Sequence, residues 1–223
     1  IKFPNSSILF NILGAVFSAQ NELDKAIENY KKAIKINPNY AQAYNNLGTA
    51  LNKLYKTNEA IDSYKKALSL KVDFAEAHNN LGNAIKELNR PKEALQYFEK
   101  AIKIKSNYAE AYNNLGATYE ELGNIKEALN NFQKAIKIDP NYAEAHNSLG
   151  ILLSDLVKFD ESLSSYNKAI KANPNYEKSY NNLGNLLNNL KKFDEATTAY
   201  HRAIKVKPDY AKAYSNLLFN LLF

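Results

Sequence analysis

Residues 109–142 read AEAYNNLGATYEELGNIKEALNNFQKAIKIDPNY, and closely similar stretches of the same length precede and follow them. Glycine marks the period, because six of the seven glycines are spaced at intervals of 34 residues. They are Gly14, Gly48, Gly82, Gly116, Gly150 and Gly184. Self-similarity at a fixed period of this size is the signature of a repeat architecture, so the repeat decides the fold.

The register of the glycines divides the chain into a lead-in over residues 1–6, six full repeats, and a half-repeat over 211–223. The half-repeat corresponds to the first helix of a seventh repeat, or to a capping or junction helix. The full repeats are 7–40, 41–74, 75–108, 109–142, 143–176 and 177–210. Residues are assigned below to positions 1 to 34 of a repeat, so that Ser7 and Ala41 both occupy position 1.

Each repeat carries the pattern of two packed helices. Apolar residues near positions 3, 7, 11 and 14, and again near 20, 24, 27 and 30, each follow one helical face. Proline at position 32 of four repeats ends the second helix. Small residues at positions 8, 20 and 27 allow the two helices to approach closely, with an aromatic ring at position 24 between them. We therefore predict an all-α fold of helix-turn-helix units.

This pattern resembles the tetratricopeptide repeat (TPR) over residues 7–223. His78 and His146 depart from the aromatic residue that the family carries at position 4. That residue is otherwise present as Phe10, Tyr44, Tyr112, Tyr180 and Tyr214. The resemblance implies an α-solenoid that forms a right-handed superhelix, with a concave groove lined by the first helices. It also implies a non-enzymatic scaffold that binds a protein or peptide partner.

The composition argues against an enzyme. The chain has no cysteine and three histidines, so cysteine-ligated metals and cysteine nucleophiles are excluded. His78 and His146 lie two repeats apart, roughly 20 Å at the usual spacing of packed helices, and cannot share a metal. They are interpreted as packing residues in place of tyrosine. We expect no catalytic residue, no metal site and no cofactor.

The 29 basic and 23 acidic residues leave a net charge of +6. Only Arg90 and Arg202 are arginine, the residue that nucleic-acid readers favour for its bidentate geometry. A nucleic-acid-binding repeat is therefore the lesser alternative, and no nucleic-acid partner is expected. Lysines at positions 26 and 29 form a ridge on the second helices, which helix dipoles and pairs such as Glu28–Lys32 explain.

No apolar run approaches the ~20 residues of a membrane span, so no membrane association is expected. The first residues do not form a signal peptide, which favours a cytoplasmic location. Because the chain contains no methionine, we expect it to be a fragment or a processed product.

Asparagine recurs at two adjacent positions of the first helix. Position 6 holds Asn46, Asn80, Asn114, Asn182 and Asn216. Position 5 adds Asn45, Asn79, Asn113, Asn147 and Asn181. A side-chain amide donates and accepts at once, so an evenly spaced ladder can hold a peptide backbone without reading its side chains. The alternative is that these asparagines belong to the framework of the repeat. The sequence leaves open whether the ligand is extended or helical.

Similar asparagine ladders line the superhelix of the O-linked N-acetylglucosamine transferases, and Asn-Leu-Gly is typical of their repeats. Residues 213–219, AYSNLLF, resemble the junction at which such repeats enter the catalytic domain. The alternative function is thus the substrate-recruiting arm of a larger glycosyltransferase-like enzyme. No catalytic residue of that family lies in this chain.

Positions 2, 6, 9 and 13 follow a second stripe of the first helix, which the resemblance places in the groove. In the three repeats from 75 to 176 this stripe carries six acids and no base. The acids are Glu76, Glu87, Glu110, Glu121, Glu144 and Asp155. We expect an acidic groove centre that selects basic partners; the alternative is that solvated acids keep the groove soluble.

The chain ends on LLFNLLF over residues 217–223, which is apolar on nearly every side of a helix. Solenoids normally finish on a polar outer face. We therefore expect end-to-end self-association through residues 211–223.

Overall fold

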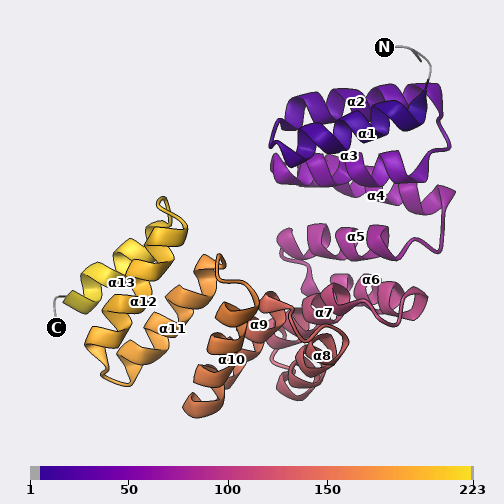
Figure 1. The fold of residues 1–223 in the computed structure, drawn as a ribbon. Coiled ribbons are helices and arrows are strands. Elements are labelled where there is room, and N and C mark those ends of the chain that lie inside the picture. Colours follow the sequence, from indigo (N-terminus) through magenta and orange to yellow (C-terminus); the bar gives the residue numbers. More distant parts are fainter. Residues whose placement is uncertain (1–5, 222–223) are drawn as a thin grey trace. The chain divides into compact units, whose positions relative to one another are not determined.

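The structure is a computed structural model, and it describes residues 6–221. Over this range it contains α-helices and no strands (Figure 1). The helices are α1 (Ser7–Ala19), α2 (Leu23–Ile36), α3 (Ala41–Lys53), α4 (Thr57–Leu70), α5 (Ala75–Glu87), α6 (Pro91–Ile104), α7 (Ala109–Glu121), α8 (Ile125–Ile138), α9 (Ala143–Asp155), α10 (Phe159–Ala172), α11 (Glu177–Asn189), α12 (Phe193–Val206) and α13 (Ala211–Leu221). The prediction of an all-α fold built from helix pairs is confirmed. Residues 1–5 of the expected lead-in and residues 222–223 lie outside the described range.

The chain forms two compact units, which divide between residues 107 and 108. The first unit contains α1 to α6, and the second contains α7 to α13. Within each unit every helix packs against the next, so consecutive pairs stack in chain order. None of the helices in residues 6–221 combines the length and the apolar character needed to cross a bilayer.

An aromatic ring seated on a glycine holds each pair together. A Cβ built on Gly116 would lie 2.8 Å from the ring of Phe132, and the other five position-8 glycines meet the position-24 ring of their own repeat in the same way. The rings of Phe98, Phe132 and Tyr200 are almost completely buried. Alanines at positions 20 and 27 lie beside the ring with no exposed surface, for example Ala128 and Ala135. The expected close approach at positions 8, 20 and 27 is therefore present.

This contact reverses the usual effect of alanine in a helix. We expect Gly116→Ala to lower the free energy of unfolding by roughly 1–3 kcal/mol, the usual cost of overpacking, although alanine is favoured over glycine inside a helix by about 1 kcal/mol. Combining it with Phe132→Leu should give a loss smaller than the sum of the two single losses, because the shorter side chain makes room for the methyl group. Urea unfolding of the four proteins measures this, and strictly additive losses would contradict the ring-on-glycine contact.

The turn inside each pair depends on a single residue in the left-handed region, always at position 15. The turn is predictable from the sequence at Asn89 and Gly123, because asparagine and glycine are common turn residues. Tyr55, Val157 and Lys191 adopt the same conformation, with φ of 59°, 62° and 58°. A β-branched side chain is strained there. The compact turn is thus imposed by the packing of the two helices, and position 15 of the fifth repeat stores strain.

Removing the strain should stabilise the protein. We expect Val157→Gly to raise the free energy of unfolding by about 1 kcal/mol. Val72 offers a matched control, because it is also an exposed loop valine (72% against 69% for Val157) but lacks a positive φ. Val72→Gly should lower stability, since glycine there only adds freedom to the unfolded chain. If both substitutions shift the urea midpoint in the same direction, relief of strain at Val157 is not the cause of the change in stability.

Candidate functional site

The first helices of successive repeats lie next to one another within each unit. These are α1, α3 and α5 in the first unit and α7, α9, α11 and α13 in the second. Their stripes at positions 2 and 6 are exposed or half-exposed. We call this exposed surface of the first helices, in each unit by itself, the groove surface.

The two rows of asparagines differ in burial. The position-6 residues of the ladder are half-exposed on the groove surface, namely Asn46, Asn80, Asn114, Asn182 and Asn216. The position-5 residues are buried, namely Asn45, Asn79, Asn113, Asn147 and Asn181. The exposed amides of the groove surface that we propose below are therefore mainly those of position 6.

Hydrogen bonds join the two rows across neighbouring repeats. The Nδ2 of a position-6 asparagine donates to the Oδ1 of the position-5 asparagine in the preceding repeat. The distances are 3.0 Å for Asn46 to Asn11, 3.1 Å for Asn80 to Asn45, 3.0 Å for Asn182 to Asn147 and 2.9 Å for Asn216 to Asn181. The ladder therefore fastens one repeat to the next. Sequence reasoning missed this role, and it omitted Asn11, although the pairing of positions 5 and 6 at a spacing of 35 residues is visible in the chain.

The ladder is interrupted in the second unit. Position 6 of the fifth repeat is Ser148, whose side chain is too short to repeat the amide bond. The Oδ1 of Asn113, which would accept that bond, is buried and has no hydrogen-bond partner. Asn113 is only 8% exposed, so its carbonyl oxygen has lost water without gaining a donor, a condition that costs free energy.

Restoring the amide should repair the ladder. We expect Ser148→Asn to raise the free energy of unfolding by about 1 kcal/mol, because it supplies the missing donor to Asn113. The gain should vanish when Asn113→Ala is already present. A double-mutant cycle followed by urea unfolding measures the coupling, and a gain that survives Asn113→Ala would show that the new side chain acts elsewhere.

The predicted groove acids are placed on the surface of the first helices, and several have partners. In the first unit Glu76 lies 3.6 Å from the ammonium group of Lys105, and the carboxylate of Glu87 accepts a 2.9 Å hydrogen bond from Asn52. In the second unit Glu110, Glu121 and Asp155 are exposed and Glu144 is half-buried. The ion pair with Lys105 was not foreseen, so the acidic character of the first unit's groove is weaker than the sequence suggests.

Tyrosines at position 34 form part of the same surface. Burial, together with the charges of Glu144 and Glu177, raises the pKa of Tyr176 to about 12. Burial also raises the pKa of Tyr142, with Glu110 and Glu144 adding to the effect. These phenols thus stay protonated donors beside the position-2 glutamates. Sequence reasoning assigned no role to position 34; tyrosine in five of six repeats was the available signal.

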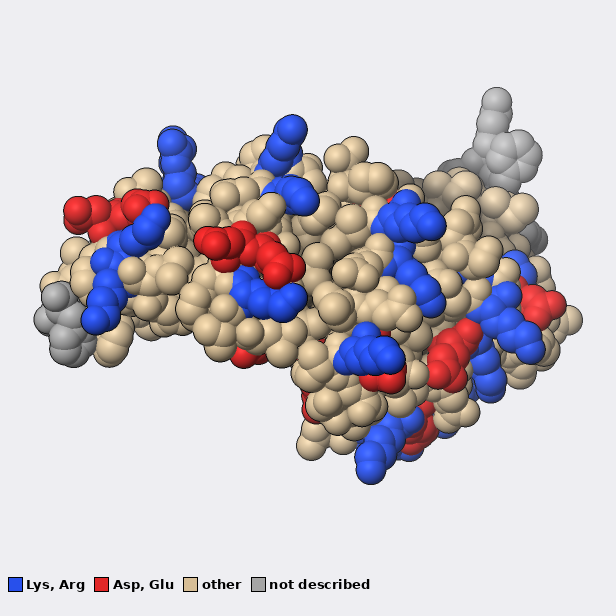
Figure 2. All heavy atoms as spheres, turned by 90° about the horizontal axis from the view of Figure 1, so that it is seen from below, with Lys and Arg blue, Asp and Glu red and all other residues tan. Residues whose placement is uncertain are grey.

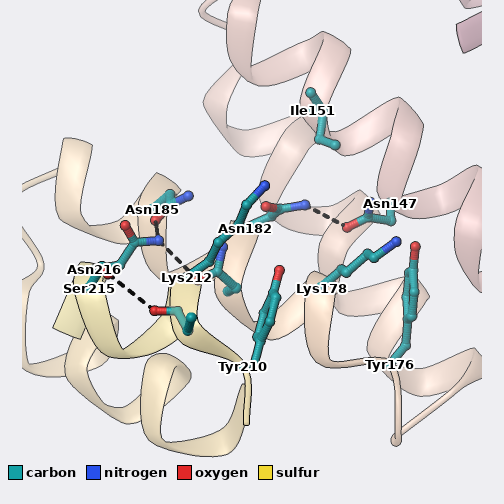
Figure 3. A pocket seen from close by; sticks show the side chains of 12 residues that line it. Asn147, Ile151, Tyr176, Lys178, Asn182, Asn185, Tyr210, Lys212, Ser215 and Asn216 are labelled. Atoms are coloured by element: carbon teal, nitrogen blue, oxygen red, sulfur yellow. Dashed lines mark hydrogen bonds between the residues drawn. The ribbon is translucent and has the colours of Figure 1, made fainter. Parts of the chain in front are cut away.

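A cavity on this surface has a volume of about 730 Å³ and lies between α9, α11 and α13 (Figure 3). Its lining contains two lysines, two tyrosines and five asparagines, and no acid. The residues are Asn147, Ile151, Tyr176, Lys178, Asn181, Asn182, Asn185, Tyr210, Ala211, Lys212, Ser215 and Asn216. A smaller cavity of about 380 Å³ in the first unit is lined by residues that include Lys53, Asn80 and Glu87.

The histidines have structural roles. The Nε2 of His78 lies 3.1 Å from the carbonyl oxygen of Val72, and that of His146 lies 2.9 Å from the carbonyl oxygen of Pro140. Each ring therefore fastens the loop that precedes its own helix. Among the described residues no three histidine, aspartate or glutamate side chains gather as metal ligands.

The lysine ridge is also tied to the fold. Lys32 lies 2.6 Å from Glu28, as expected, and its ammonium group stands 5.9 Å from the ring centre of Phe10. Lys134 stands in the same way over Tyr112, at 5.7 Å. In these two repeats the lysine at position 26 thus covers the aromatic ring at position 4, a cation–π arrangement, whereas Lys100 stands over Tyr97 at 5.6 Å. On the face drawn in Figure 2, basic and acidic side chains are interspersed.

The chain belongs to the tetratricopeptide repeat family. Models of this repeat match residues 14–54 and 53–89, residues 73–141 and 108–175, and residues 177–210. Proteins of this family bind protein or peptide partners, and they are generally scaffolds without catalytic activity. No curated protein sequence matches the chain.

Three solved structures illustrate the relationship. The MamA protein is 30% identical, with a TM-score of 0.61 over 72% of this chain and 94% of that chain. YrrB, described as a TPR protein with an unusual peptide-binding site, is 27% identical, with a TM-score of 0.56 over 83% of this chain and 96% of that chain. A chain of the APC/C hetero-tetramer Cut9–Hcn1 superposes with a TM-score of 0.88 at 18% identity, which shows the fold alone. That match covers 98% of this chain but 43% of the other, so this chain spans less than half of its length.

Proposed function

We propose that the protein is an interaction module that holds a peptide segment of its partner in the groove of the first helices. The observation that carries the proposal is the state of the position-6 amides. The amino groups of Asn80 and Asn182 are fixed by the buried asparagine of the preceding repeat, while their Oδ1 atoms accept no hydrogen bond from any described residue. Such pre-oriented acceptors suit the N–H groups of a peptide backbone.

The relatives support this assignment. YrrB, which is described as having a peptide-binding site, shares the repeat architecture over most of both chains. We assign residues 7–210 to six repeats and residues 211–223 to the first helix of a seventh, or to a capping or junction helix. A cytoplasmic location stays a prediction, as does the right-handed superhelix.

The partner segment that we infer contains lysine or arginine. In the second unit Glu110 and Glu144 stand beside the protonated phenol of Tyr142, and neither Glu144 nor Asp155 is ion-paired with a described residue. Carboxylates on adjacent helices repel one another, and a cation from the partner would relieve the repulsion. Solvation of the same acids is the simpler alternative.

The contribution of the groove asparagines to peptide binding can be tested by comparing their substitution with substitution of the buried asparagines to which they donate. We expect Asn80→Ala with Asn182→Ala to weaken a panel of unrelated binding peptides alike, by roughly thirtyfold, because each of the two lost backbone hydrogen bonds is worth about 1 kcal/mol. The peptides are first selected from a random display library on the unmodified chain, and their affinities are then measured by fluorescence anisotropy.

The matched control is Asn45→Ala with Asn147→Ala. It removes the same two inter-repeat hydrogen bonds from the buried side, together with the bond from the Ser179 hydroxyl to Asn147, and leaves the groove amides in place. It should lower the urea midpoint as much as the groove variant does, with a smaller loss of affinity. Equal losses of affinity in the two variants would overturn the proposal that the groove amides contact the peptide.

A second candidate function is the substrate-recruiting arm of a larger glycosyltransferase-like enzyme. Its support is the asparagine ladder and the resemblance of residues 213–219 to the entry into a catalytic domain. The same segment motivates the proposal of end-to-end association, because Leu218, Phe219 and Leu221 are exposed on α13. The complete reading frame distinguishes the recruiting arm from end-to-end association. A downstream glycosyltransferase domain supports the function as a recruiting arm, and a stop codon close to residue 223 excludes that function.

A further inference from the structure

The position-2 residues of the second unit form a row in which the charge changes sign. From α7 to α13 they are Glu110, Glu144, Lys178 and Lys212. All four occupy the same place on consecutive first helices, and neighbouring first helices of the unit contact each other. A segment that crosses these helices therefore meets two acids and then two bases. We call this set the charge row.

The basic half of the row lies in the cavity of about 730 Å³ between α9, α11 and α13. Figure 3 shows the side chains of Tyr176, Lys178 and Lys212 extending into this cavity. Both lysines are exposed, and neither is ion-paired with a residue in 6–221. The lining contains no acid, so neither lysine meets a carboxylate inside the cavity.

The neutral side chains around the lysines add hydrogen-bond donors. The Oδ1 of Asn185 already accepts bonds from the Tyr200 hydroxyl and from Asn216, both at 2.9 Å, which leaves its amino group as the unused part of the amide. Burial raises the pKa of Tyr176 and of Tyr210, so both phenols keep their protons. A cavity with two cations and several donors is complementary to carboxylates.

The acidic half of the row has the opposite chemistry. Glu144 contributes to the raised pKa of both Tyr142 and Tyr176, which places its charge between the two phenols. Glu144 and Lys178 do not form an ion pair, although they occupy neighbouring helices. The charges of Glu144 and Lys178 are thus not cancelled by an ion pair between them, and the change of sign along the row is kept.

We propose that the charge row selects an extended partner segment of two charge blocks, with lysine or arginine over Glu110 and Glu144 and with aspartate or glutamate side chains over Lys178 and Lys212. The inference rests on the proposed function, and it replaces a uniformly basic partner by a bipolar one. Packed helices are about 10 Å apart and an extended chain rises about 3.3 Å per residue, so charged residues about three apart match the row.

The test compares peptides of one composition. One peptide carries two lysines followed by two aspartates at this spacing, and the other alternates lysine and aspartate. Both have acetylated and amidated ends, so that no terminal charge contributes. We expect the block peptide to bind the full chain roughly tenfold more tightly than the alternating peptide at low salt, with the difference shrinking as salt screens the charges.

The variant Lys178→Glu with Lys212→Glu makes the row entirely acidic. It should weaken the block peptide by roughly tenfold and strengthen an all-lysine peptide. Lys137→Glu with Lys171→Glu changes the net charge equally on the exposed position-29 lysines of the second helices. This control should leave the preference for the block peptide unchanged.

Failure of the inference differs from failure of the proposed function. If peptides bind but block and alternating peptides bind equally, or if the control abolishes the preference as well, the charge row is not the selecting element and the proposed function stands. A carboxylate effect seen only with a free peptide C-terminus would likewise overturn the assignment to side chains. If neither the charged peptides nor the library yields any binding, both proposals fall.

Discussion

The contact on which the rest of the structure depends is the aromatic ring of position 24 resting on the glycine of position 8. It sets how close the two helices of a pair come, because the ring occupies the volume of the missing side chain. With that distance fixed, alanines at positions 20 and 27 fill the remaining space without exposed surface. Six copies of one contact give six equivalent pairs, and equivalent pairs can stack with their first helices on one surface. On α13 the corresponding residue is Leu218, 63% exposed, so a second helix with a ring at position 24 could not pack there as it does elsewhere.

The asparagine pairs are the second constraint, and they link stability to the groove. Each half-exposed amide such as Asn80 donates to a buried amide such as Asn45, and the bond both fastens two repeats and orients the carbonyl oxygen that remains. The spacing of the groove acceptors is therefore inherited from the stacking of the repeats. Where the pair is broken, at Asn113 and Ser148, the chain loses a structural bond and an evenly placed groove amide together.

Most of the fold could be predicted because a 34-residue period repeats every contact, so one repeat explains the rest. The turns could not be predicted fully, since Val157 and Tyr55 carry no local preference for a positive φ and adopt it because the packing of the helix pair requires it.

The candidate site was harder to predict than the fold. Positions 5 and 6 both read as asparagine, but a helix turns about 100° per residue, so one faces the neighbouring repeat and the other the groove. Position 34 was given no role in the site, although the hydroxyl group distinguishes Tyr176 from a purely apolar residue.

The net charge of +6 predicts neither the charge of the groove surface nor that of the lysine ridge. Two lysines at position 26 have their charge engaged within the fold: Lys32 pairs with Glu28 and covers Phe10, and Lys134 covers Tyr112. Lys178 and Lys212 carry the same charge at position 2, where no acid of the described chain meets them. Since a buried or paired charge responds weakly to a ligand and an uncompensated one strongly, the position within the repeat decides which lysines take part in recognition. The two lysines of the charge row, rather than the more numerous lysines of the ridge, are therefore the cations that a partner can distinguish.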